Sequence, residues 1–200
     1  TAGAGCYSTR IITVNPLPSA ITGTPTTCVG QCTTLGSATP GGTWSSSAPA
    51  IGSINTATTS LCGVTAGTTI VSYTLPTTCR VTQIVTVYAL PSAIGGSLQV
   101  CQGATGTLTT TTPGGTWASS NLAVGTVDAT TGAITGMSTG TTTVTYTLGT
   151  GCSVTAVVTV NAIPDPITGP LQVCVGQTTT SFSGPLPGTW SSSSTGIATI

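Results

Sequence analysis

Short segments of alternating apolar and polar residues run through the chain. Apolar Val, Tyr and Leu alternate with Thr between residues 144 and 148, and Val and Ala alternate with other residues between 154 and 160. Clusters of Gly, Pro and Ser separate these segments. A period of two residues bounded by turn residues is typical of half-buried β-strands. No stretch shows a helical period, so the pattern predicts an all-β fold.

The same pattern predicts about seven strands in the first part of the chain, in the ranges 19–28, 31–38, 42–47, 50–55, 59–63, 68–75 and 79–87. Seven short antiparallel strands can bury a core only as two packed sheets, because each strand supplies one inward row of side chains. We therefore expect a β-sandwich. Trp44 is expected to fill its centre against Tyr73, with the polar atoms of both residues bonded at the sheet edge.

An internal repeat follows from the positions of the tryptophans. Trp44, Trp117 and Trp190 are equally spaced, since each number exceeds the one before it by 73. This spacing, the repeat step, indicates one structural unit copied along the chain. We therefore expect Trp117, Trp190 and Tyr146 to occupy core positions equivalent to those of Trp44 and Tyr73. Six cysteines follow the same step, in the two series Cys6, Cys79, Cys152 and Cys28, Cys101, Cys174.

Proline-containing joints near residues 15–18, 89–91 and 162–164 set the frame of the repeat. The first complete repeat is expected at 16–88 and the second at 89–161. Residues 1–15 are then the last strand of a preceding repeat, and 162–200 the first half of a following one. Both ends fall inside a repeat and no signal peptide is evident, so we expect an internal or processed part of a longer protein.

Six short segments of the two complete repeats carry a family resemblance. They are GTWSSS at 42–47, AIGSIN at 50–55 and GVTAGTTIV at 63–71, then WASSN at 117–121, VGTVD at 124–128 and GMSTGT at 136–141. These segments resemble the bacterial immunoglobulin-like domain, group 2. The resemblance implies tandem immunoglobulin-like β-sandwiches, which in that family form the stalks of surface adhesins and other secreted proteins.

The charged residues are Arg10, Arg80, Asp128 and Asp165, and the chain has no Lys, Glu or His. General acid–base and nucleophilic catalysis need titrating groups beside the reacting atom, which this composition does not supply. Zinc and calcium sites need clusters of thiolates, imidazoles or carboxylates. Two cations cannot bind a nucleic acid backbone, and no apolar run is long enough for a membrane span. We therefore expect no enzyme, metal, cofactor, nucleic acid partner or membrane-spanning segment.

Eight cysteines without metal-ligand spacing indicate disulfides and an extracellular location. Cys32 and Cys62 are present in the first repeat only, and Thr105 and Thr135 replace them together in the second. They are expected to lie near the same end of neighbouring antiparallel strands. We predict a cross-strand disulfide between them.

The repeating cysteines allow two kinds of pairing. Counting favours bonds within each repeat, Cys28 with Cys79 and Cys101 with Cys152. Strands that alternate in direction would instead place these partners at opposite ends of a strand, about 23 Å apart, whereas a disulfide needs Cα atoms within about 7 Å. The alternative joins different repeats, for example Cys28 with Cys152, or joins different chains. Spacing alone does not decide between these pairings.

The leading functional hypothesis is an extracellular stalk or filament on the cell surface. A neutral surface lacks the repulsion that keeps copies apart, so copies of the chain are the expected partners. The many Thr and Ser residues suit strands and offer sites for O-linked glycans. Two alternatives stay open, an adhesin module that recognises carbohydrate or protein, and a passive spacer beside another domain.

Overall fold

The computed structural model of the chain describes residues 9–57, 59–184 and 188–200. Cys6 and the first half of the predicted strand at 1–15 therefore lie outside the described residues. The described residues form strands and turns, without a helix, which confirms the all-β fold. Residues 9–15 belong to no strand, so this part of the expected tail strand is wrong. None of the described residues forms a helix of the length and apolarity that crossing a membrane requires.

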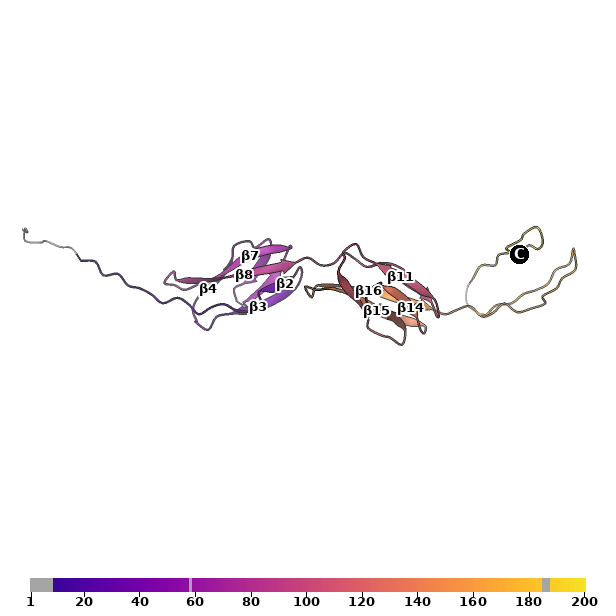
Figure 1. Ribbon diagram of the computed structural model, residues 1–200, viewed down its shortest axis with the longest axis horizontal. Helices are drawn as coiled ribbons and strands as arrows, with labels where there is room; N and C mark the ends of the chain where they lie inside the picture. Colours follow the sequence, from indigo (N-terminus) through magenta and orange to yellow (C-terminus); the bar gives the residue numbers. More distant parts are fainter. Residues whose placement is uncertain (1–8, 58, 185–187) are drawn as a thin grey trace, which may run out of the picture. The chain divides into compact units, whose positions relative to one another are not determined.

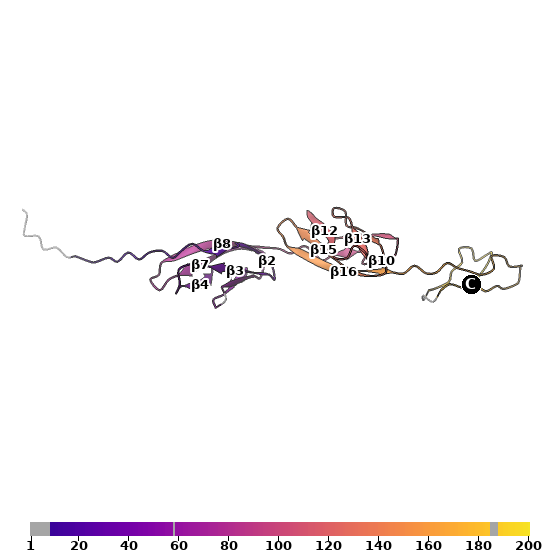
Figure 2. The same cartoon turned by 90° about the horizontal axis from the view of Figure 1, so that it is seen from below.

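Eight strands between residues 22 and 88 form two four-stranded sheets (Figures 1 and 2). Six of them match predicted strands within two residues at each end. One sheet has the order β1-β3-β6-β5, with the bounds Thr22–Gly23, Cys32–Gly36, Ser60–Gly63 and Gly52–Asn55. The other has the order β2-β8-β7-β4, with the bounds Thr26–Cys28, Arg80–Tyr88, Gly67–Thr74 and Thr43–Ser46.

Residues 95–161 form the same two sheets a second time. One has the order β13-β14-β11-β9, with the bounds Gly125–Val127, Ala133–Gly136, Thr105–Thr109 and Gly95–Gly96. The other has the order β10-β16-β15-β12, with the bounds Gln99–Cys101, Ser153–Asn161, Gly140–Leu148 and Gly115–Ser119. These strands fall inside the predicted repeats 16–88 and 89–161, whose exact boundaries stay a prediction.

The predicted first strand, 19–28, is wrong as a single strand, because the chain breaks at Gly23 and changes sheet. Gly23 has a φ of 110°, and a Cβ there would collide with the carbonyl oxygen of Thr34. Pro25, two residues later, has no N–H for a sheet ladder. The part before the break, β1, pairs antiparallel with β3, and the part after it, β2, pairs parallel with β8. This switch ties the two sheets together through the backbone.

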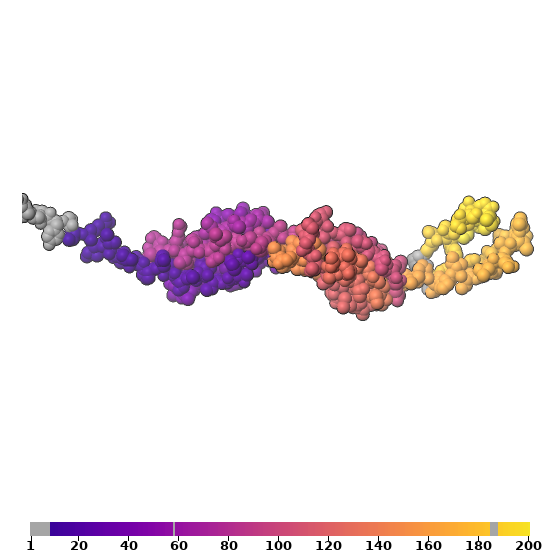
Figure 3. Space-filling model, in the orientation of Figure 1, coloured from indigo at the N-terminus to yellow at the C-terminus, as the bar shows by residue number. Residues whose placement is uncertain are grey.

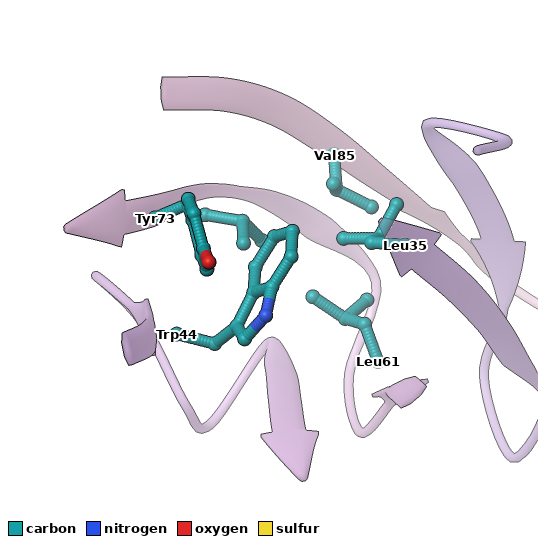
Figure 4. Close-up of a cluster of buried hydrophobic side chains, with 6 residues drawn as sticks. Leu35, Trp44, Leu61, Tyr73 and Val85 are labelled. Atoms are coloured by element: carbon teal, nitrogen blue, oxygen red, sulfur yellow. The ribbon is translucent and has the colours of Figure 1, made fainter. Parts of the chain in front are cut away.

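The core of the first sandwich lies between its two sheets (Figure 4). The Trp44 and Tyr73 rings lie on neighbouring strands, with centroids 4.7 Å apart and planes tilted by 46°. Leu35 and Leu61, from the opposite sheet, close over them and are fully buried. The alternation that predicted the strands is thus the alternation between core and surface.

Each member of this core has a buried equivalent one repeat step later. The pairs are Leu35 and Leu108, Trp44 and Trp117, Leu61 and Ile134, Val71 and Val144, Tyr73 and Tyr146, and Val85 and Val158. The one exchange, Leu61 for Ile134, keeps the side-chain volume. The sequence repeat is therefore a repeat of packing.

Candidate functional site: the cysteines and the repeated core contacts

The parallel pairing of β2 with β8 excludes the favoured disulfide within the repeat. Cys28 lies opposite Tyr88, at the last residue of β8. Cys79 precedes the first residue of the same strand, so about 30 Å of extended backbone separate it from Tyr88. Cys101 lies opposite Asn161 in the same way, at the far end of β16 from Cys152. The pairings of Cys28 with Cys79 and of Cys101 with Cys152 are therefore wrong.

Cys28 instead forms a disulfide with Cys152, the alternative that spacing had left open. Their Cα atoms are 5.7 Å apart, within the usual range for a disulfide, and 124 residues separate them in the sequence. Both belong to the first of two compact units of the chain, which comprises Thr1–Ile94, Thr110–Thr116 and Thr145–Thr155. Cys152 is almost fully buried, and Cys28 is half-buried.

The second disulfide joins Cys32 to Cys62, as their joint presence in one repeat predicted. The two residues lie directly opposite each other on the antiparallel strands β3 and β6, with Cα atoms 4.0 Å apart. Opposite residues of antiparallel strands approach closely enough for such a bond. In the second sandwich Thr105 and Thr135 lie opposite each other at the equivalent positions.

Three of the described cysteines are free: Cys79, Cys101 and Cys174. Cys101 and Cys174 are exposed, and Cys79 is half-buried. The Cys79 thiol lies 3.6 Å from the carbonyl oxygen of Asn15, to which it donates. All three belong to the two cysteine series that follow the repeat step, so their equivalents include both members of the Cys28–Cys152 disulfide.

The tyrosine hydroxyls bond at the edge of the sheet, as expected for buried phenols. Tyr73 donates to the carbonyl oxygen of Thr39 at 2.5 Å and accepts from the amide of Gly42 at 2.8 Å. Tyr146 repeats both contacts in the second sandwich, with Thr112 at 2.7 Å and Gly115 at 2.8 Å. These hydroxyls fix the turn before the tryptophan strand. Trp44, Trp117, Tyr73 and Tyr146 are all buried, with at most 8% of their surface exposed.

Trp190 differs, because 44% of its surface is exposed, so its expected place in a core is wrong for this structure. Trp44 packs on Tyr73 of β7, and the position equivalent to Tyr73 falls beyond residue 200. In the described residues from 162 onward, the backbone pairing is an isolated bridge between Thr168 and Phe182 rather than a sheet. Figure 3 shows open space between the orange segment that follows the second sandwich and the yellow C-terminal segment. A hollow of about 260 Å³ is lined by Gly188, Thr189 and Trp190, the equivalents of 42–44.

A buried threonine in each sandwich was missed from the sequence. The Thr69 hydroxyl lies 2.7 Å from the Ser46 hydroxyl and accepts from the amide of Ala48 at 3.1 Å. Thr142 makes the matching contacts with Ser119 and Asn121 at 2.7 and 3.1 Å. Both threonines are 2% exposed. Their recurrence after one repeat step was the available signal, but the many other Thr residues obscured it.

Asp128, the charged residue of the second sandwich, stabilises a turn. The carboxylate of Asp128 accepts from the amides of Thr130 and Thr131 and from the Thr131 hydroxyl. The amide and then the hydroxyl of Thr131, followed by the amide of Thr130, hold the pKa of Asp128 below its usual value. The described residues contain no group of three or more side chains suited to a metal ion.

Comparison with known proteins supports an immunoglobulin-like fold for the chain. Residues 80–160 match the family model described as bacterial Ig-like domain (group 2). A crystallised 282-residue C-terminal fragment of intimin, in complex with the translocated intimin receptor's intimin-binding domain, is 20% identical, with a TM-score of 0.51. That match covers 77% of this chain and 67% of the fragment.

A second solved structure, domains 4 and 5 of the S-layer protein SbsC, is 19% identical with a TM-score of 0.35. It matches over 74% of this chain and 100% of its own length. The comparison with curated proteins finds no significant match. The intimin likeness supports the fold, and the family match covers residues 80–160. The resemblance seen in the sequence is confirmed: residues 80–160 of this all-β chain match the model of the bacterial immunoglobulin-like domain, group 2.

Proposed function

We propose that this chain is a load-bearing structural segment of an extracellular stalk or filament, built from immunoglobulin-like sandwiches. The observation that carries the proposal is the disulfide between Cys28 and Cys152. A force applied along the chain from its two ends passes through this bond. Residues 29–151, with most strands of both sandwiches, lie outside that covalent path.

This bypass suits a mechanical role. Sandwich strands held only by hydrogen bonds separate under load one after another, whereas a covalent bond does not yield in this way. The disulfide also supports an oxidising, extracellular setting, since such bonds are rare in reducing compartments. The bond and the group 2 immunoglobulin-like family therefore support the same role.

The surface supports association between copies. The outer faces of β7 and β8 expose Ile70 and Ile84, which lie opposite each other and are 45% and 62% exposed. Val157, the equivalent of Ile84, is 57% exposed. The formal net charge of the chain is zero, so no long-range repulsion opposes the contact of such faces. We infer that copies of the chain are the partners.

Electron microscopy of the purified chain in oxidising buffer tests the proposal. We expect ordered fibres that thicken as protein concentration rises, because the neutral faces pack side by side. The variant Ile84→Lys adds a charge to that outer face without touching the core and is expected to disperse them. Dispersed particles of the unmodified chain at every concentration would contradict the structural role and favour an adhesin module or a spacer.

A further inference from the structure

The free Cys101 has the same backbone setting as the bonded Cys28. Each is the last residue of a three-residue strand that pairs parallel with the end of the long final strand of its sandwich. The amide three residues further along donates to the cysteine carbonyl at 3.0 Å in both. Gly30 and Gly103, two residues after each cysteine, share a φ of 78°. The backbone conformation around Cys28 thus recurs around Cys101.

The free Cys79 in turn has the setting of the bonded Cys152. Each directly precedes the long last strand of its sandwich and closes a tight turn. In that turn the amide of Leu75, or of Leu148, donates to the cysteine carbonyl at 2.9 Å. The residue before each cysteine has a positive φ, 69° in the first sandwich and 86° in the second. The two halves of the observed disulfide therefore each have an unpaired copy.

Within these 200 residues, neither copy has a partner cysteine at the sequence separation of the observed bond. The observed bond joins a cysteine to another 124 residues later. The same step forward from Cys101 leads past residue 200, and the same step back from Cys79 leads before residue 1. We propose that Cys101 and Cys79 each form a disulfide of the kind that joins Cys28 to Cys152. Cys101 takes the place of Cys28 and Cys79 that of Cys152, and each pairs with the matching cysteine of another copy of the repeat.

The chemistry requires an oxidant. Each thiol loses a proton and one electron as the sulfur–sulfur bond forms, and a low-molecular-weight disulfide accepts the two electrons and becomes two thiols. Cys101 is exposed and Cys79 is half-buried, so a partner thiol can reach both. Repetition of the bond along the array would link the repeats to one another covalently.

The first test adds the missing half to the full chain. Joining a copy of residues 128–161 after residue 200 completes the third repeat and places a copy of Cys152 at the required step from Cys101. Under oxidised glutathione, non-reducing peptide mapping with chymotrypsin is expected to find Cys101 bonded to that added cysteine. Chymotrypsin is chosen because trypsin cuts this chain only after Arg10 and Arg80.

Two controls accompany this map. In the variant Cys101→Ser, the added cysteine should stay reduced, which excludes random oxidation. Cys174 should stay free in the extended chain, because its own partner lies one repeat further on. The proposal is overturned if Cys101 stays reduced, or if the added cysteine bonds to Cys174 within the same repeat.

A second arm identifies where the partner copy comes from. An equimolar mixture of ¹⁴N- and ¹⁵N-labelled copies of the unextended chain is oxidised and mapped. Mixed-isotope peptides that join Cys79 to Cys101 would support pairing between separate chains. If they are absent while the extended chain forms its bond, the pairing is supported within one polypeptide.

This inference rests on the proposed structural role, but the two fail separately. If fibres form while Cys101 stays reduced in the extended chain, the covalent link is contradicted and the structural role stands. If the predicted bond forms but no fibres appear, the covalent link stands and the structural role is contradicted.

Discussion

Replacing Trp44 with alanine is expected to lower the free energy of unfolding of the first sandwich by about 3 to 5 kcal/mol. Only 8% of the Trp44 surface is exposed, and the indole packs between the sheets on the Tyr73 ring at 4.7 Å. Its removal loses apolar burial and leaves a cavity that the surrounding Leu35 and Leu61 cannot fill. Urea unfolding followed by circular dichroism measures the change.

The chain supplies a matched control for this substitution. Trp190 occupies the same place in the repeat but is 44% exposed, so Trp190→Ala is expected to change stability by less than about 1 kcal/mol. Trp117→Ala should behave as Trp44→Ala does, in the second sandwich. Equal small effects at Trp44 and Trp190 would show that the first sandwich has no packed centre at Trp44.

Removing the Cys28–Cys152 disulfide is expected to lower the free energy of unfolding by up to about 5 kcal/mol, the value that the chain-entropy model gives for a loop of roughly this length. The double variant Cys28→Ser, Cys152→Ser removes both thiols, so no new pairing can arise at these positions. Calorimetry in oxidising buffer measures the loss.

The matched control is Cys101→Ser, at the position equivalent to Cys28. Cys101 is exposed and unbonded within the chain, so its replacement is expected to change stability by less than about 0.5 kcal/mol. An unchanged transition temperature in the double variant would indicate that Cys28 and Cys152 are not bonded in solution.

The strands and the core followed from the sequence because both depend on local patterns. Period-two alternation located six of the eight strands in the first sandwich, and the repeat step placed Trp117 and Tyr146 in a second core. Cys32 and Cys62 were paired correctly because β3 and β6 are neighbours in the sheet. Each of these inferences needed only the side-chain pattern of single or adjacent strands and the comparison of one repeat with the next.

The direction of β2 could not be derived in this way. Its parallel pairing with β8 depends on a break at Gly23 that the alternation of the flanking residues does not reveal. Because β2 runs parallel to β8, Cys28 lies at the opposite end of β8 from Cys79 and bonds to Cys152 instead. Trp190 was misplaced for a related reason, since burial depends on strands far away in sequence.

Single-molecule stretching of the whole chain, held at its two ends, tests the load-bearing role of the Cys28–Cys152 disulfide most directly. An extended chain spans about 3.5 Å per residue, so the disulfide should shorten the fully stretched molecule by about 430 Å over its 124-residue separation. Reductant should restore that length, and the variant Cys32→Ser, Cys62→Ser should keep the shortening. Full extension without reductant would contradict the account.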